Sequence, residues 1–156
     1  MAGDIFKFEG IPSDYLASVT RIIEEVNEEF LPPLSSRMTS IDMMLTGQDL
    51  RNEGINAYLK SMRKQVNFIL MTDGKILGIA SVYANFFEEK IELWCPCAYL
   101  TTIAVSKSAR QQGFAKRLYK AVIQYAQHYG QPRLVTRTWS TNHSHMELAF
   151  SLGLTE

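Results

Sequence analysis

The sequence predicts an α/β fold in which helices cover both faces of a mixed central sheet. Segments with strand-like and helix-like spacing alternate in the order strand, helices, hairpin, strand, helix, strand, helix. No repeat, low-complexity tract or linker interrupts this order, so we expect residues 1–156 to form a single domain. With 46% of its residues hydrophobic, the chain can bury a genuine core.

The N-terminal segment is predicted to form a short strand followed by a helix. Residues 4–10 alternate apolar and polar side chains, which suits a strand ended by Gly10. Ser13 is a candidate N-cap, and apolar residues recur at helical spacing after it. The helix is expected to stop at Pro32 and Pro33.

The middle of the chain is predicted to contain a β-hairpin. Two apolar runs flank Asp73-Gly74, a dipeptide that favours a type I′ turn. Before the hairpin we expect residues 34–47 to form a loop with a short helical piece. Residues 48–64 have helical spacing despite Gly54.

The C-terminal part is predicted to alternate strands and helices. Pro96 bars a regular position in a central ladder, and a strand follows it. A helix should begin at about Gly113 and end at Gly130 and Pro132. Its buried stripe is expected to contain Phe114, Leu118, Val122, Tyr125 and Tyr129.

Two further elements are expected near the C-terminus. Residues 133–139 have the pattern of a strand, and the segment "HMELAFSLG" that follows the polar "STNHS" is predicted to be an amphipathic helix. Asn142 or Ser144 is its candidate cap.

Charge and composition exclude several classes of partner. Sixteen basic residues balance sixteen acidic ones, and aromatic residues are not interleaved with basic ones, so we expect no nucleic-acid binding. No basic leader and no apolar run long enough for a membrane span is present, so we expect a cytoplasmic protein. Cys95 and Cys97 are expected to be reduced thiols, because one pair cannot build a disulfide framework.

The segment "RQQGFA", residues 110–115, is a candidate anion site. The first turn of a helix presents unpaired backbone N–H groups, and Gly113 and Ala115 leave that backbone accessible. The nearby cations Arg110, Lys116, Arg117 and Lys120 would add positive charge. The pattern is neither a P-loop nor a dinucleotide fingerprint. The alternative is an ordinary solvated helix start.

Residues 99–126 resemble the signature segment of the GCN5-related N-acetyltransferase (GNAT) family. The family pattern Arg/Gln-x-x-Gly-x-Gly/Ala is matched by Arg110, Gly113 and Ala115. A second landmark is similar, since Asn142 precedes Gly153 by the interval common in the family. The resemblance implies a GNAT-like fold, in which the sheet opens beside its central strand to receive acetyl-CoA.

The resemblance also implies which residues bind acetyl-CoA. The backbone of Ile103, Ala104 and Val105 would pair with the pantetheine arm. Asn142 would hydrogen-bond the cofactor from the next strand. The diphosphate loop would comprise Arg110, Gln111, Gln112, Gly113, Phe114 and Ala115.

The implied reaction is transfer of an acetyl group from acetyl-CoA to a primary amine of a small molecule or peptide, by direct attack in a ternary complex. Glu92 and Tyr99 are the candidate catalytic residues. Ala149 stands where many relatives carry a tyrosine that acts as the general acid. Several further groups are therefore also candidates for proton transfer. These are Glu88, Cys95, Cys97, His143 and His145.

Three expectations about partners follow. No metal is expected, because His143 and His145 have no obvious third ligand. The acidic residues 88, 89 and 92 would suit a cationic amine. The chain lacks the two strands with which most relatives end, so an uncovered sheet edge predicts a homo-oligomer, most simply a dimer.

Two other functions stay open from the sequence. One is a non-catalytic acyl-CoA-binding or regulatory module, because neither usual proton-transfer group is in its usual position. The other is an unrelated α/β protein that carries the motif by chance.

Overall fold

The computed structural model describes residues 3–30, 33–36, 51–86, 97–131, 133–138 and 142–155. The strands are β1 (Asp4–Glu9), β2 (Val66–Thr72), β3 (Lys75–Phe86), β4 (Cys97–Val105) and β5 (Leu134–Thr136). The α-helices are α1 (Ser13–Glu25), α3 (Arg51–Met62), α4 (Phe114–His128) and α5 (His143–Ser151). Short 3-10 helices are η1 (Asn27–Glu29), η2 (Leu34–Ser36) and η4 (Lys107–Ala109).

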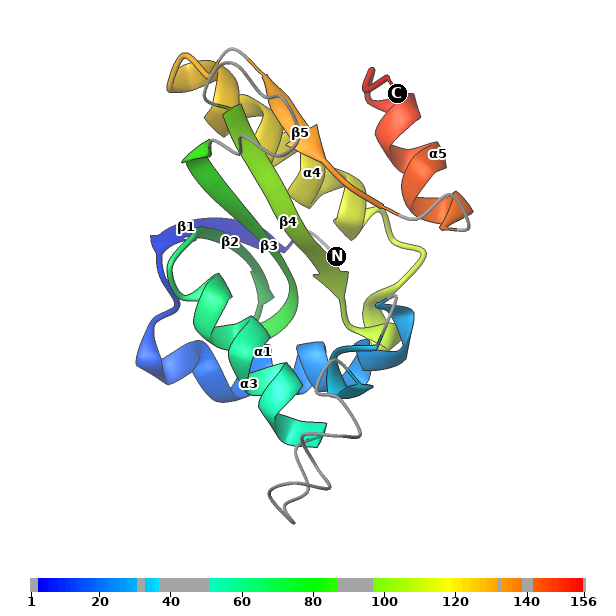
Figure 1. The fold of residues 1–156 in the computed structure, drawn as a ribbon. Helices are drawn as coiled ribbons and strands as arrows, with labels where there is room; N and C mark the ends of the chain where they lie inside the picture. Colours follow the sequence, from blue (N-terminus) through cyan, green and yellow to red (C-terminus); the bar gives the residue numbers. More distant parts are fainter. Residues whose placement is uncertain are drawn as a thin grey trace.

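The predicted fold class is confirmed. The five strands form one sheet in the order β1-β2-β3-β4-β5, with antiparallel pairs from β1 to β4 and a parallel pair between β4 and β5. Helix α4 covers one face, whereas α1 and α3 cover the other (Figure 1). The short β5 leads towards α5, which stands beside the open side of the sheet (Figure 1).

Each face of the sheet has its own core. Alternating residues of the strands point to opposite faces, so neighbours in sequence enter different cores. Leu70 and Ala80 pack with α4, while Ile69 and Ile79 pack with α1 and α3. Leu118 of α4 and Ile23 of α1 are among the largest side chains that are completely buried. Together the two cores fix the helices on either side of β4.

Several predicted boundaries are confirmed by their backbone geometry. Asp73 and Gly74 both have positive φ, 50° and 74°, as a type I′ turn requires. Helix α4 ends at His128, and Gly130, which follows the C-cap, has a φ of 64°. The amides of Gly130 and Gln131 bond back to Gln127 and Ala126, at 3.1 and 2.9 Å, so the last carbonyls of the helix are satisfied.

The predicted limits of the first helix are wrong at both ends. Ser13 is already helical, Pro12 holds the N-cap position, and no side chain caps the helix. The α-helix ends at Glu25 rather than near the prolines, because the chain tightens into the 3-10 turn η1. Near the other terminus the strand predicted for residues 133–139 forms only over Leu134–Thr136.

Two further predictions are corrected on α4 and α5. Tyr129 is 54% exposed instead of buried, because it lies at the C-cap and its ring stacks against Tyr125 and Lys7 on the surface. Helix α5 starts at His143, two residues earlier than expected, with Asn142 as its N-cap.

Some predictions fall outside the described residues. They concern residues 37–50, Pro96, Cys95 and residue 139. Within the described ranges, no helix combines the length and the apolar character needed to cross a membrane.

Gly54 has a packing role that the sequence does not reveal. A Cβ atom at this position would lie 1.9 Å from the carbonyl oxygen of Leu34. Helix α3 therefore packs directly on the backbone of η2, and only glycine permits this approach.

We predict that Gly54→Ala lowers the free energy of unfolding by roughly 2 kcal/mol or more, because backbone must move to accept the methyl group. Urea denaturation measures the loss. Gly74→Ala is the matched control, since a Cβ at Gly74 would meet no atom within 4 Å and only its φ of 74° would oppose the change. Equal stability of Gly54→Ala and the parent protein would contradict this packing.

Candidate functional site

The site is organised by an irregularity in β4. Along β3, Ser81 pairs with Thr102 but the next residue, Val82, pairs with Leu100. Thr101 is therefore an extra residue, a β-bulge, in the central strand. A bulge reverses the alternation of everything that follows it in the strand.

The side chains of β4 show this reversal. Before the bulge, Ala98 and Leu100 contribute to the core under α4. After it, Ile103 and Val105 do so, whereas Ala104 joins the opposite core. Even-numbered residues thus face α4 before the bulge and odd-numbered residues face it afterwards.

The backbone of β4 is reversed in the same way. Before the bulge, even-numbered residues bond towards β5: Ala98 N–H donates to the carbonyl of Arg133 at 2.9 Å. After it, Ser106 N–H donates to Leu77 of β3 at 2.8 Å. The N–H and C=O groups of Ile103 and Val105 consequently point away from β3.

These groups meet no strand on their far side. The pairing of β4 with β5 covers Ala98 to Leu100 and ends at Thr136. Within the described residues, the amides of Ile103 and Val105 find no acceptor, and the Val105 carbonyl accepts only from Arg110 Nε, at 3.3 Å. The edge of β4 is thus open to a ligand that offers its own donors and acceptors.

Hydrogen bonds from α3 and its C-terminal turn hold the bulge. Thr101 Oγ1 donates to the buried Gln65 Oε1 at 2.6 Å. The Tyr58 hydroxyl lies 2.5 Å from Thr102 Oγ1 and 3.2 Å from the Thr101 carbonyl oxygen. The bulge and the open edge therefore depend on contacts made far along the chain.

The N-terminus of α4 adds a second set of unpaired groups. Gly113 is its N-cap with φ of 77°, and Gln111 is also left-handed with φ of 61°. No described residue accepts from the backbone amides of residues 111–116. Because the helix dipole is positive at this end, the amides form a site for an anion.

The loop that precedes α4 is fixed by two carboxylates from the other side of the sheet. Glu29 holds the Arg110 guanidinium through hydrogen bonds of 2.7 and 2.6 Å. Glu25 accepts from the backbone N–H of Lys107 and lies 3.4 Å from Ser106 Oγ. The hydrogen bonds to Glu29 hold the pKa of Arg110 above its ordinary value.

The four cations predicted around the anion site have different positions. Arg110 forms a salt bridge with Glu29, and a guanidinium nitrogen of Arg117 donates to the Gly3 carbonyl. Lys116 lines the cleft, while Lys120 is exposed. Arg110 and Arg117, two of the four predicted cations, therefore already have partners within the protein.

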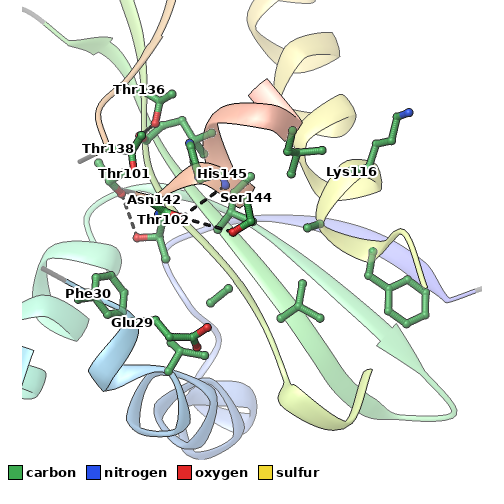
Figure 2. Close-up of a pocket in the computed structure, with 18 of the residues that line it drawn as sticks. Glu29, Phe30, Thr101, Thr102, Lys116, Thr136, Thr138, Asn142, Ser144 and His145 are labelled. Atoms are coloured by element: carbon green, nitrogen blue, oxygen red, sulfur yellow. Dashed lines mark hydrogen bonds between the residues drawn. The ribbon is translucent and has the colours of Figure 1, made fainter. Parts of the chain in front are cut away.

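A cleft of about 950 Å³ joins the open edge to the helix terminus. Figure 2 shows Thr101 and Thr102 of β4 between Glu29 and Phe30 on one side and Asn142, Ser144 and His145 on the other. Of the residues predicted to bind the cofactor, all but Gln112 line this cleft: Ile103, Ala104, Val105, Arg110, Gln111, Gly113, Phe114, Ala115 and Asn142. Gln112 is exposed next to it.

The two predicted catalytic residues have different outcomes. Tyr99 lines the cleft, opposite Tyr83 of β3, and the Arg137 guanidinium lies 5.7 Å from the centre of its ring. Glu92 lies outside the described residues, as do Glu88 and Glu89. Among the described lining residues the acidic side chain is Glu29, which is paired with Arg110.

Helix α5 contributes the far wall. Asn142 Oδ1 accepts from His145 N–H at 3.4 Å and so caps the helix. His145 lines the cleft, and burial lowers the pKa of its imidazole. His143 is exposed. The described residues contain no group of three or more side chains that could hold a metal ion.

Sequence reasoning missed the residues that position the site. Glu25 and Glu29 give no sequence signal, because they lie about eighty positions before the loop that they hold. Tyr58 and Gln65 lie 43 and 36 positions before Thr101, which is also beyond the reach of local sequence patterns. The Tyr99–Val105 segment did contain one signal, two adjacent threonines in an otherwise apolar strand.

The chemistry that this arrangement offers is recognition of an anion linked to an amide-containing chain. The amides of residues 111–116 suit phosphate oxygens, and the open edge at Ile103 and Val105 suits peptide-like groups. Both lie in one cleft, so a single extended ligand can occupy them together.

The sequence matches one family of known proteins over most of its length. Residues 23–153 match the family described as acetyltransferase (GNAT) family. No curated protein sequence matches the chain at a significant level.

Solved structures share the fold. The acetyltransferase AAC(6')-Iy, in complex with the bisubstrate analogue CoA-S-monomethyl-acetylneamine, has 19% identity and a TM-score of 0.68, covering 100% of this chain and 92% of that one. A protein of Pyrococcus horikoshii OT3 has 15% identity and a TM-score of 0.74, covering 99% and 90%. An aminoglycoside acetyltransferase from an uncultured soil metagenomic sample, in complex with trehalose, has 17% identity and a TM-score of 0.64, covering 99% and 89%.

We predict that Glu29→Gln loosens the loop with little loss of global stability. The pair is half exposed, so its loss should cost less than about 1 kcal/mol. Order parameters of residues 107–113 from ¹⁵N relaxation should fall from about 0.85 towards 0.6. Glu24→Gln, an exposed carboxylate in the last turn of α1, is the control. Unchanged order parameters in Glu29→Gln would refute the clamp.

Proposed function

Because the chain belongs to the GNAT acetyltransferase family, we propose that it transfers an acetyl group from acetyl-CoA to a primary amine of a small molecule or peptide. The observation that carries the proposal is the continuity between the open β4 edge and the unpaired amides at the start of α4. Coenzyme A has the matching order of groups, a diphosphate followed by an arm with two amides.

The backbone supplies most of the proposed binding site. Amides of residues 111–115 would bind the diphosphate, and the N–H and C=O groups of Ile103 and Val105 would pair with the pantetheine arm. The Arg110 guanidinium would shape the loop rather than contact phosphate, since Glu29 occupies it. Lys116 is a nearby cation that lines the cleft, and Asn142, the N-cap of α5, would face the arm.

Attack on the thioester would be direct. The neutral amine nitrogen forms a bond to the carbonyl carbon, the carbon–sulfur bond then breaks, and the sulfur leaves as a thiolate. The nitrogen loses one proton to a base or water. Because the CoA thiol is acidic, its thiolate can leave without being protonated by the enzyme. An unpaired amide of the β4 edge would stabilise the oxyanion. Tyr99 and Glu92 remain the proposed proton-transfer residues.

The described walls of the cleft favour an acceptor with hydrogen-bonding groups. Beyond the bulge the lining is aromatic and hydroxyl-rich, with Tyr58, Ser61, Tyr83 and Tyr99. Phe30 packs edge-on against Tyr58, with ring centres 5.0 Å apart. An amino sugar or another polyhydroxylated amine suits such a surface, and the likeness to aminoglycoside acetyltransferases supports this class of acceptor.

The role of the loop amides can be tested with two glycines of one helix. Gly113 and Gly130 flank α4, both are left-handed, and a Cβ at either would meet no atom within 4 Å. Alanine at either position should therefore introduce a similar backbone strain, about 1–2 kcal/mol. Only Gly113→Ala should raise the KM for acetyl-CoA, by roughly five- to tenfold, because only its strain displaces the anion site.

The assay measures release of the CoA thiol from acetyl-CoA in the presence of a panel of primary amines, amino sugars included. Amine-dependent release with the predicted difference between the two alanine variants supports the proposal. Thermal stabilisation by acetyl-CoA without release from any amine would support the non-catalytic binding module instead. Absence of both effects would reject acetyl-CoA as the substrate.

A further inference from the structure

Two buried polar atoms beside the cleft have no hydrogen-bond partner. They are the hydroxyl of Tyr119, on α4, and Nε2 of His145, on α5. The two side chains face each other, with ring centres 5.9 Å apart and planes inclined by 55°. Buried polar atoms are almost always paired, so two orphans side by side need an explanation.

The pair lies where the sheet opens. Thr136, the last residue of β5 that pairs with β4, lies against the Tyr119 hydroxyl. The Thr136 hydroxyl donates to the Leu100 carbonyl at 3.0 Å, and it forms no hydrogen bond with the Tyr119 hydroxyl. Thr136 and His145 both line the cleft, and Figure 2 shows Thr136 on β5 and His145 on α5.

The protonation states of the two groups are complementary. Burial raises the pKa of Tyr119 to about 12, so the phenol keeps its proton at neutral pH and is a donor. Burial lowers the pKa of His145, so the imidazole is neutral and has one acceptor and one donor nitrogen. The ring centres are 5.9 Å apart, so the two side chains are direct neighbours.

We propose that His145 hydrogen-bonds an amide carbonyl of the acetyl-CoA arm and that Tyr119 is the positioning residue that orients its imidazole. In the bound state the Tyr119 hydroxyl donates to Nε2, which fixes the proton on Nδ1, and Nδ1–H donates into the cleft. Both orphaned atoms then gain partners when the ligand binds. This inference rests on the proposed function, because it assumes that the arm lies along the β4 edge.

The unpaired Tyr119 hydroxyl would thereby lower the stability of the ligand-free protein and favour ligand binding. An unpaired buried hydroxyl destabilises the ligand-free protein, and its removal leaves an apolar ring of the same shape. Tyr119→Phe should consequently be as stable as the parent protein or more stable, while it binds the ligand less well. A hydroxyl with a merely structural partner would give the opposite effect on stability.

The test compares two ligands by titration calorimetry. Coenzyme A carries the arm, whereas adenosine 3′,5′-diphosphate lacks it. His145→Ala should raise the Kd for coenzyme A about tenfold and Tyr119→Phe about threefold, with the Kd for adenosine 3′,5′-diphosphate unchanged within twofold. His143→Ala, an exposed histidine on the same helix, is the matched control and should bind both ligands normally.

Each alternative result has a distinct meaning. Coenzyme A affinity within twofold of the parent in both variants, equal losses for the two ligands, or a lowered Tm in Tyr119→Phe would overturn the inference. If His145→Ala does not fold, His145→Gln preserves the volume of the side chain and takes its place in the comparison. A parent protein that binds neither ligand would instead reject the proposed function.

Discussion

One extra residue in the central strand determines the chemistry of this molecule. Without the bulge at Thr101, strand alternation would turn the backbone groups of Ile103 and Val105 towards β3, where they would form hydrogen bonds with that strand. With it, they face the side on which β5 has already diverged. The bulge is held by Gln65 and Tyr58, so the α3 side of the molecule controls what the opposite edge of β4 can bind.

In the loop before α4, the backbone and the side chains have separate roles. Its amides are the groups that face the cleft, while its side chains secure it to the rest of the protein. Glu25 and Glu29 reach it from the end of α1 and from η1. Arg110, which matches the family motif, is therefore better understood as a structural member of the loop than as a direct ligand for phosphate. A preorganised backbone needs little rearrangement to bind an anion, and this lowers the entropic cost of association.

Local chemistry made much of the fold predictable. Asp73-Gly74 defines its hairpin because few other dipeptides accept two positive φ angles, and Gly113 marks the start of α4 for a similar reason. The loop and strand of the candidate site followed from such signals together with the family resemblance. The bulge at Thr101 and the clamp from Glu29 could not be predicted, because both depend on partners that only the tertiary fold brings near. The unpaired atoms at the α4–α5 contact are hidden for the same reason, since a sequence does not show which buried groups lack partners.

Binding of coenzyme A as proposed requires that the β4 edge be unpaired in the free protein and paired in the complex. Residue-resolved amide hydrogen exchange by NMR measures this directly. The amides of Ile103 and Val105 should exchange rapidly in the free protein and at least about tenfold more slowly with coenzyme A, while Ala104, bonded to β3, should be protected in both states. Equal protection of all three amides in the free protein, or no slowing at Ile103 and Val105 on saturation with coenzyme A, would contradict it.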